Sequence, residues 1–226
     1  LNTLLRRMID RAEAKGATQA DALAVEYTEG HVRVRLGEVE QIQQASQRRI
    51  GLRVLTGQSQ AMTSSGDLRP ETLDRLVDDT VAMARLTASD PHAGLPDRAL
   101  TGAAHVERPD LFDPESAEFE LAGGADWAKR AEKAALDSDP RFTNSEGSEF
   151  GFASSLSAYA ASGGVEGSYR SSYFSGYVVP VAKADDGGME RDYWYSQRRY
   201  FNDLESAETI GRIAAERTLR RLGAVQ

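Results

Sequence analysis

Two patterns of apolar residues, one typical of strands and one typical of helices, constrain the fold of this chain most strongly. In the first half, apolar and polar residues alternate in stretches that end near Tyr27, Leu36 and Val54. Such alternation is typical of antiparallel strands that bury one face. Three further strand-like runs follow in the second half: 148–162, 169–182 and 189–201. The chain is therefore expected to contain two sets of antiparallel strands.

Local signals predict how these strands begin, turn and end. The apolar face of the first strand is expected to consist of Leu23, Val25 and Tyr27. Glycines punctuate the pattern. They predict a tight turn at Glu29-Gly30, a bulge or bend at Gly37, and a turn at Thr56-Gly57 into a weaker strand over 58–64. A strong hairpin signal covers 185–188.

Apolar residues at helical spacing predict four helices around these strands. Caps and prolines indicate their ends. The first is capped by Asn2 and ends at Gly16, and the second opens at Pro70 and runs to about Thr87. The third begins at Asp113-Pro114 and reaches Asp137, and the last is capped by Asn202 or Asp203 and stops at Gly223.

A proline- and glycine-containing stretch over 88–113 is the best internal boundary, with one short strand expected near His105. We expect a first helix, antiparallel-sheet and helix unit over 1–100 and a second over 101–226. The shared order of elements suggests an internal duplication, but residue identity between the halves is too thin to show one. Either way the fold class is α+β, with antiparallel sheets packed against helices.

Composition excludes several classes of protein. The chain has 35 acidic and 27 basic residues and a net charge of -8, which disfavours direct nucleic-acid binding. It has no cysteine, which excludes disulfides and thiolate zinc sites and fits a reducing compartment such as the cytoplasm. No run approaches the roughly 18–20 apolar residues of a membrane-spanning helix. The chain starts at Leu1 rather than Met, so we expect a piece of something longer.

No catalytic or metal-ligating motif stands out in this chain. The three histidines, His31, His92 and His105, have no metal-ligand spacing, and no serine-nucleophile or phosphate-loop motif is present. Two acidic pairs, Asp78-Asp79 and Asp185-Asp186, are interpreted as a solvated helix face and a hairpin turn. We therefore predict no catalytic residue, no metal site and no cofactor in this chain.

The placement of the aromatic residues is the most informative anomaly. Of 17 aromatic residues, 13 lie at or beyond Phe142. One interpretation is a sheet covered on both sides, with a subunit contact as one form of cover. The other is a cleft where an extended peptide adds to a sheet edge and aromatic side chains form its pockets. The residues expected to bind peptide or partner are Tyr173, Tyr177, Arg191, Tyr193 and Tyr195.

Several ordered motifs resemble one protein family. In the first half they are Leu36-Gly37-Glu38-Val39-Glu40, Ala61-Met62-Thr63-Ser64-Ser65 and Gly94-Leu95-Pro96. In the second half they are Asp110-Leu111-Phe112-Asp113-Pro114, Phe142-Thr143-Asn144-Ser145-Glu146-Gly147 and Gly188-Met189-Glu190-Arg191-Asp192-Tyr193-Trp194-Tyr195. Together they resemble the TldD/PmbA family, and its PmbA (TldE) branch in particular.

The resemblance implies a subunit of a cytoplasmic heterodimeric metalloprotease that acts on unfolded peptides in peptide maturation or turnover. Zinc is then expected only in a TldD-type catalytic partner. The family's older label, modulator of DNA gyrase, would reflect an indirect link, because the acidic balance argues against DNA contact. No membrane association is expected.

Family members are about twice this length, and the zinc motif of the TldD branch, H-E-x-x-x-H, lies in their second half. No catalytic residue carries over to this chain. The leading hypothesis is an N-terminal scaffold portion of a PmbA-type subunit. The alternatives are a peptide-binding or oligomerisation scaffold with no protease role, and a stand-alone hydrolase with an unrecognised site.

Overall fold

A computed structural model describes residues 1–97, 99–101 and 110–223. The described α-helices are α1 (Asn2–Ala14), α2 (Pro70–Leu86), α3 (Leu121–Leu136) and α4 (Ala207–Arg221). The described strands are β1 (Gln19–Arg35), β2 (Glu38–Thr56), β3 (Ser59–Ser65), β4 (Phe142–Ala161), β5 (Glu166–Lys183), β6 (Met189–Arg191) and β7 (Trp194–Arg198). Short 3-10 helices are η1 (Pro114–Ala117), η2 (Ser162–Gly164) and η3 (Phe201–Asp203). The predicted strand near His105 lies outside the described residues.

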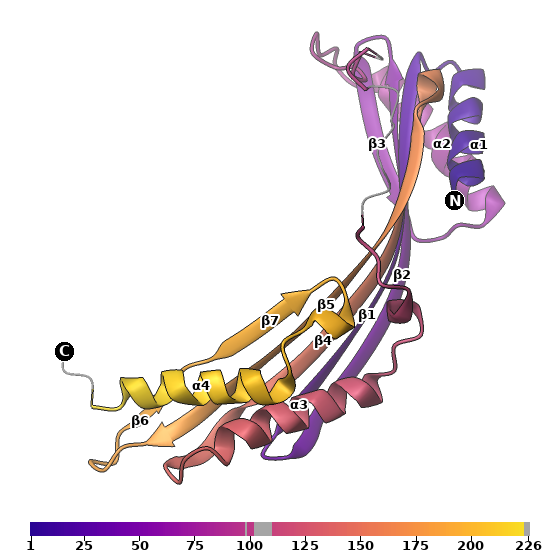
Figure 1. The fold of residues 1–226 in the computed structure, drawn as a ribbon. Coiled ribbons are helices and arrows are strands. Elements are labelled where there is room, and N and C mark those ends of the chain that lie inside the picture. Colours follow the sequence, from indigo (N-terminus) through magenta and orange to yellow (C-terminus); the bar gives the residue numbers. More distant parts are fainter. Residues whose placement is uncertain (98, 102–109, 224–226) are drawn as a thin grey trace. The chain divides into compact units, whose positions relative to one another are not determined.

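The strands form one antiparallel sheet in the order β3-β2-β1-β4-β5-β6, and β7 also pairs with β5 (Figure 1). The α+β class is thus confirmed, and the strands predicted in the two halves of the sequence belong to one sheet. The strands are longer than their patterns suggested, since β1, β2, β4 and β5 each hold 17 to 20 residues.

The chain forms two compact units that share these long strands. Unit 1 comprises residues 1–27, 46–110 and 155–170, and unit 2 comprises residues 28–45, 111–154 and 171–226. Each unit therefore draws on both halves of the sequence. The predicted division near residue 100 and the suggested duplication stay predictions.

In unit 1, α1 and α2 pack on one face of the sheet over a buried core (Figure 1). The strands present alanines to these helices, including Ala20, Ala22 and Ala24, which are fully buried. The apolar face expected from Leu23, Val25 and Tyr27 is therefore the face away from the helices, and 48% of Leu23 is exposed. Small residues occupy the covered face because they let a helix approach a strand closely.

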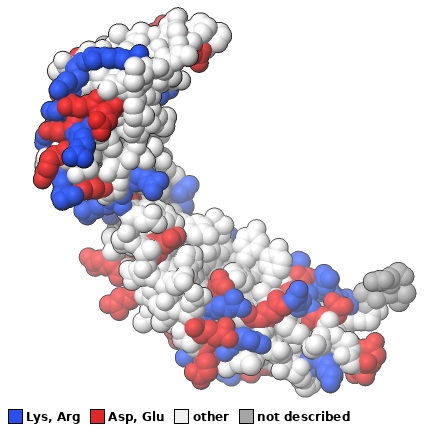
Figure 2. Space-filling view, turned by 180° about the vertical axis from the view of Figure 1, so that it is seen from behind, with Lys and Arg blue, Asp and Glu red and all other residues white. Residues whose placement is uncertain are grey.

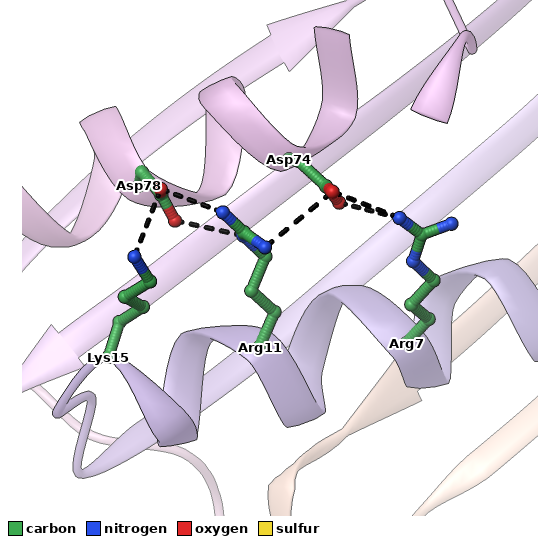
Figure 3. Close-up of polar contacts among 5 residues, drawn as sticks. All are labelled: Arg7, Arg11, Lys15, Asp74 and Asp78. Carbon is green, nitrogen blue, oxygen red and sulfur yellow. Dashed lines mark hydrogen bonds and ion pairs between the residues drawn. The ribbon is translucent and has the colours of Figure 1, made fainter. Parts of the chain in front are cut away.

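Ion pairs join the two helices of unit 1 along their length (Figure 3). Asp74 lies 2.9 Å from Arg7 and 3.5 Å from Arg11, and Asp78 lies 2.8 Å from Arg11 and 3.2 Å from Lys15. Hydrogen bonds from Arg11 hold the pKa of Asp78 below its ordinary value. Asp78 therefore stabilises the packing of α1 against α2. This agrees with the sequence-based interpretation of Asp78 as a residue on the helix surface.

In unit 2, α3 and α4 lie side by side along one face of the sheet (Figure 1). Aromatic rings fill the core beneath them, and glycines make room for these rings. A Cβ atom at Gly176 would lie 2.3 Å from the ring of Trp127, and one at Gly124 would lie 2.5 Å from Phe150. The packing around Gly211 of α4 is equally close, because a Cβ there would lie 2.3 Å from the carbonyl oxygen of Ala131 in α3.

The same requirement explains why the predicted turn at Glu29-Gly30 is wrong. Gly30 lies inside β1, and a Cβ there would lie 2.4 Å from Phe152. The reversal occurs instead at Leu36 and Gly37, with φ of 51° and 81°. Two successive positive φ values are typical of a tight β-hairpin turn.

The predicted N-terminal caps of three helices are also wrong. Asn2 is not a cap, since α1 begins after Leu1 without a side-chain cap. Asp113 caps the short η1 rather than α3, which begins at Leu121. The last helix is capped by Ser206, whose hydroxyl accepts from the Thr209 amide, rather than by Asn202 or Asp203. The second helix, the hairpin at 185–188 and the Thr56-Gly57 turn are confirmed.

Two adjacent glycines of α3 provide a matched test of the packing. Gly124→Ala should lower the free energy of unfolding by about 1–3 kcal/mol, because Phe150 is buried and cannot move aside cheaply. Gly123→Ala should be neutral or stabilising by up to about 1 kcal/mol, since its Cβ would meet only Phe119 at 3.7 Å. Urea denaturation of both variants measures this, and equal effects would contradict the packing described.

A second pair of variants tests the ion pairs of unit 1. Asp78→Asn should lower the free energy of unfolding at pH 7 by about 0.5–1 kcal/mol, whereas Asp79→Asn, at an exposed neighbouring position, should change it little. Because the pKa of Asp78 is depressed in the folded state, its contribution is present above about pH 4 and is lost as the pH falls below that value. Denaturation across pH 2 to 7 should show the difference disappear in acid; a difference that persists there would contradict an ionic origin.

Candidate functional site

The candidate site lies on the uncovered face of the sheet in unit 2. Along β5, side chains alternate between the two faces. Phe174 and Val178 are buried toward α3 and α4, whereas Tyr173 and Tyr177 are half-buried on the opposite face. The alternation thus separates core aromatic residues from surface tyrosines.

A break between β6 and β7 directs two further tyrosines to the same face. The Asp192 amide donates to the Thr218 hydroxyl at 3.0 Å, and the Tyr193 amide donates to the Asp192 carboxylate at 2.8 Å. Trp194 then packs against the core, with the Arg217 guanidinium 5.4 Å from its ring centroid. Tyr193 and Tyr195 remain 52% and 54% exposed, with ring centroids 6.3 Å apart.

Four of the five predicted binding residues line one cavity of about 500 Å³, which we call the tyrosine groove. Its lining residues are His31, Glu149, Gly151, Tyr173, Ser175, Gly176, Tyr177, Val179, Tyr193, Tyr195 and Gln197. Two lining residues, His31 of β1 and Glu149 of β4, were not predicted from the sequence. No local signal marks them, because only the order of strands in the sheet, with β4 between β1 and β5, brings them to the same surface as the tyrosines.

Glu149 interacts with two neighbours at the groove. Its carboxylate accepts a hydrogen bond from the Tyr177 hydroxyl, and burial together with this bond raises the pKa of Tyr177 to about 12. The Arg33 guanidinium lies 3.6 Å away and also reaches Glu40 at 3.3 Å. The groove therefore combines aromatic rings with one carboxylate.

Arg191, the fifth predicted residue, lies in a neighbouring hollow rather than in the groove. It forms an ion pair with Glu146, and the hollow of about 790 Å³ that both line also contains Tyr193. Tyr193 therefore borders both cavities. Whether any of the five residues binds peptide or partner stays a prediction.

The edge of the sheet beside the groove is open along β7. Among the described strands, β7 pairs only with β5, through Trp194–Arg198 and Phe174–Val178. A hollow of about 630 Å³ adjoins this edge. An unpaired edge presents backbone donors and acceptors to which an extended chain can add.

Unit 1 has a smaller apolar hollow on its own uncovered face. It measures about 460 Å³ and is lined by Leu23, Val25, Tyr27, Gln47, Arg49, Gly51 and Ser64. On another part of unit 1, Arg53 and Tyr159 both bind Asp21, at 2.8 and 3.1 Å. Burial is the main cause that raises the pKa of Tyr159 to about 12.

The residues described do not fit a zinc ion. His31 lies 3.7 Å from Glu29, and His92 is in a loop where its amide donates to Asp90. Within the described ranges, no three His, Asp or Glu side chains gather where they could hold a metal. Figure 2 shows acidic and basic side chains interspersed on the face it draws. No helix in the described part is both long and apolar enough to span a membrane.

Two family models match this chain. One, described as "PmbA/TldA metallopeptidase domain 1", matches residues 20–84, and the other, "PmbA/TldA metallopeptidase central domain", matches residues 113–222. The chain belongs to the PmbA/TldD family. The resemblance found in the sequence motifs is thereby confirmed.

Individual relatives agree with this membership. Metalloprotease PmbA of Escherichia coli O157:H7 is 36% identical over 210 residues, which are 92% of this chain and 46% of that protein. This PmbA/TldD-family chain thus spans about half the length of the curated relatives it matches. It corresponds to the N-terminal half of full-length family members.

Two solved structures share the fold. One is a Bacteroides thetaiotaomicron protein described as a modulator of DNA gyrase, with a TM-score of 0.89 and 24% identity. It covers 99% of this chain, which spans 50% of that one. The other is TldE from Thermococcus kodakarensis, with a TM-score of 0.84 and 16% identity. The match covers 96% of this chain and 47% of that one. At these identities the likeness shows the fold alone.

Truncation variants test whether the tyrosines are surface or core residues. Tyr195→Ala should change the free energy of unfolding by less than about 1 kcal/mol, as an exposed site does. Phe174→Ala, on the covered face, should cost about 3–5 kcal/mol. Chemical denaturation of both variants measures the difference. Comparable losses would mean that the tyrosine face is covered in solution, as the alternative interpretation of the aromatic residues holds.

Proposed function

We propose that this chain is the N-terminal scaffold portion of a PmbA-type (TldE-type) subunit in a cytoplasmic metalloprotease assembly that acts on unfolded peptides. In this proposal a TldD-type partner supplies the zinc and the hydrolysis. This chain helps to form the peptide channel and contacts the partner. Membership in the PmbA/TldD family supports the assignment to a metalloprotease system.

The observation that carries the binding role is the tyrosine groove beside an open sheet edge. An extended peptide can pair with the backbone of β7 and insert alternate side chains among Tyr193, Tyr195 and their neighbours. Aromatic side chains give large contact areas at low entropic cost, which suits a site that accepts varied sequences. The proposal assigns the hydrolytic chemistry to the partner.

A binding module with no protease role is the second candidate, and the same groove supports it. The two differ in the partner they require. Under the proposed function, a TldD-type protein from the source organism should co-purify with this chain, and under the second candidate it should not.

The direct test mixes the tagged chain with purified TldD-type protein and an unfolded peptide. We expect the chain alone to cleave nothing, the two proteins to co-elute, and the double variant Tyr193→Ala/Tyr195→Ala to reduce retention of peptide several-fold. Lys129→Ala, on an exposed part of α3, is the matched control and should leave retention unchanged. Tight zinc binding with peptide cleavage by this chain alone would overturn the proposal, and so would failure to co-elute.

A further inference from the structure

The charge of the tyrosine groove suggests which side chain it accepts. Among the described residues that line it, Glu149 is the one acidic side chain, and neither lysine nor arginine is present. Arg33 lies 3.6 Å from Glu149 but is not among the residues that line the groove. A ligand side chain entering the groove therefore meets a carboxylate and aromatic rings rather than a positive charge.

The carboxylate of Glu149 is incompletely neutralised by its neighbours. The Tyr177 hydroxyl occupies one acceptor position. Arg33 divides its charge among several acceptors: it donates to the Glu146 carbonyl at 2.7 Å, pairs with Glu40 at 3.3 Å and lies 3.6 Å from Glu149. A carboxylate has about four acceptor positions, so Glu149 keeps capacity for a charged donor. Its side chain is 31% exposed, which leaves it within reach of a ligand.

The tyrosine rings add a second attraction for a cation, beside that of the carboxylate. The faces of tyrosine rings carry negative potential and attract ammonium and guanidinium groups. Tyr193 and Tyr195 are half exposed and inclined at 29° to one another, and both line the cavity that contains Glu149. A second carboxylate, Glu29, lies 3.7 Å from the groove residue His31.

We propose that the tyrosine groove binds a lysine or arginine side chain of the extended peptide, with its cation between the tyrosine rings and hydrogen-bonded to Glu149. This inference rests on the proposed function, because it names the residue type that the peptide-binding site prefers. An acidic side chain would be repelled by Glu149. An apolar one would shield that carboxylate further from water and bring no donor of its own.

Three unfolded peptides that differ at one position, with lysine, norleucine or glutamate, test the inference by calorimetric titration. The lysine peptide should bind about tenfold more tightly than the norleucine peptide, as expected for a cation–π contact combined with a charged hydrogen bond. The glutamate peptide should bind more weakly than either. Raising the salt concentration should shrink the preference.

Matched variants locate the effect. Glu149→Gln should reduce the preference for lysine to within about twofold. Glu146→Gln removes a nearby carboxylate that pairs with Arg191 in the adjacent hollow, and it should leave the preference intact. If Glu149→Gln does not fold, the salt dependence of the unmodified chain decides in its place.

The outcomes separate this inference from the proposed function. Equal binding of the lysine and norleucine peptides, or a preference insensitive to salt, would overturn the inference and leave peptide binding in place. If none of the three peptides binds, with or without the TldD-type partner, both fail.

Discussion

The close fit between glycines and aromatic rings in unit 2 is the constraint on which the rest of the site depends. Trp127 lies against Gly176, and Phe150 lies against Gly124, at distances that leave no space for a Cβ atom. This fit lets α3 and α4 seal one face of the sheet with large rings. Because strand side chains alternate, sealing one face leaves the residues between them on the other face.

That alternation connects the core to the proposed function. The residues that face away from the helices include tyrosines whose rings stay accessible to solvent, and they meet a carboxylate from a different strand. Exposed apolar and aromatic patches on one face of a sheet are typical of surfaces that bind something. Binding of an extended peptide is therefore the role that we propose for these residues.

The sequence predicted much of this architecture and part of the site. Periodicity identified the helices and the α+β class, and aromatic clustering pointed to tyrosines that do line one groove, Tyr193 among them. Prediction from the sequence failed where a tertiary contact overrides a local signal. Gly30 resembled a turn residue but makes room for Phe152 inside a strand, and Leu23 resembled a core residue because alanines on the covered face are weak signals. Glu149 could not be predicted, since only strand pairing brings it beside the tyrosines.

The most direct test is nuclear magnetic resonance of the chain with labelled tyrosine rings, titrated with an unfolded lysine-containing peptide. The chain contains 8 tyrosines, which act as internal reporters for both units. We predict that the ring signals of Tyr173, Tyr177, Tyr193 and Tyr195 shift together, while that of Tyr159 in unit 1 does not. Shifts confined to Tyr159 and other tyrosines outside the groove, or no shifts at peptide saturation, would contradict the claim that the tyrosine groove is the binding surface.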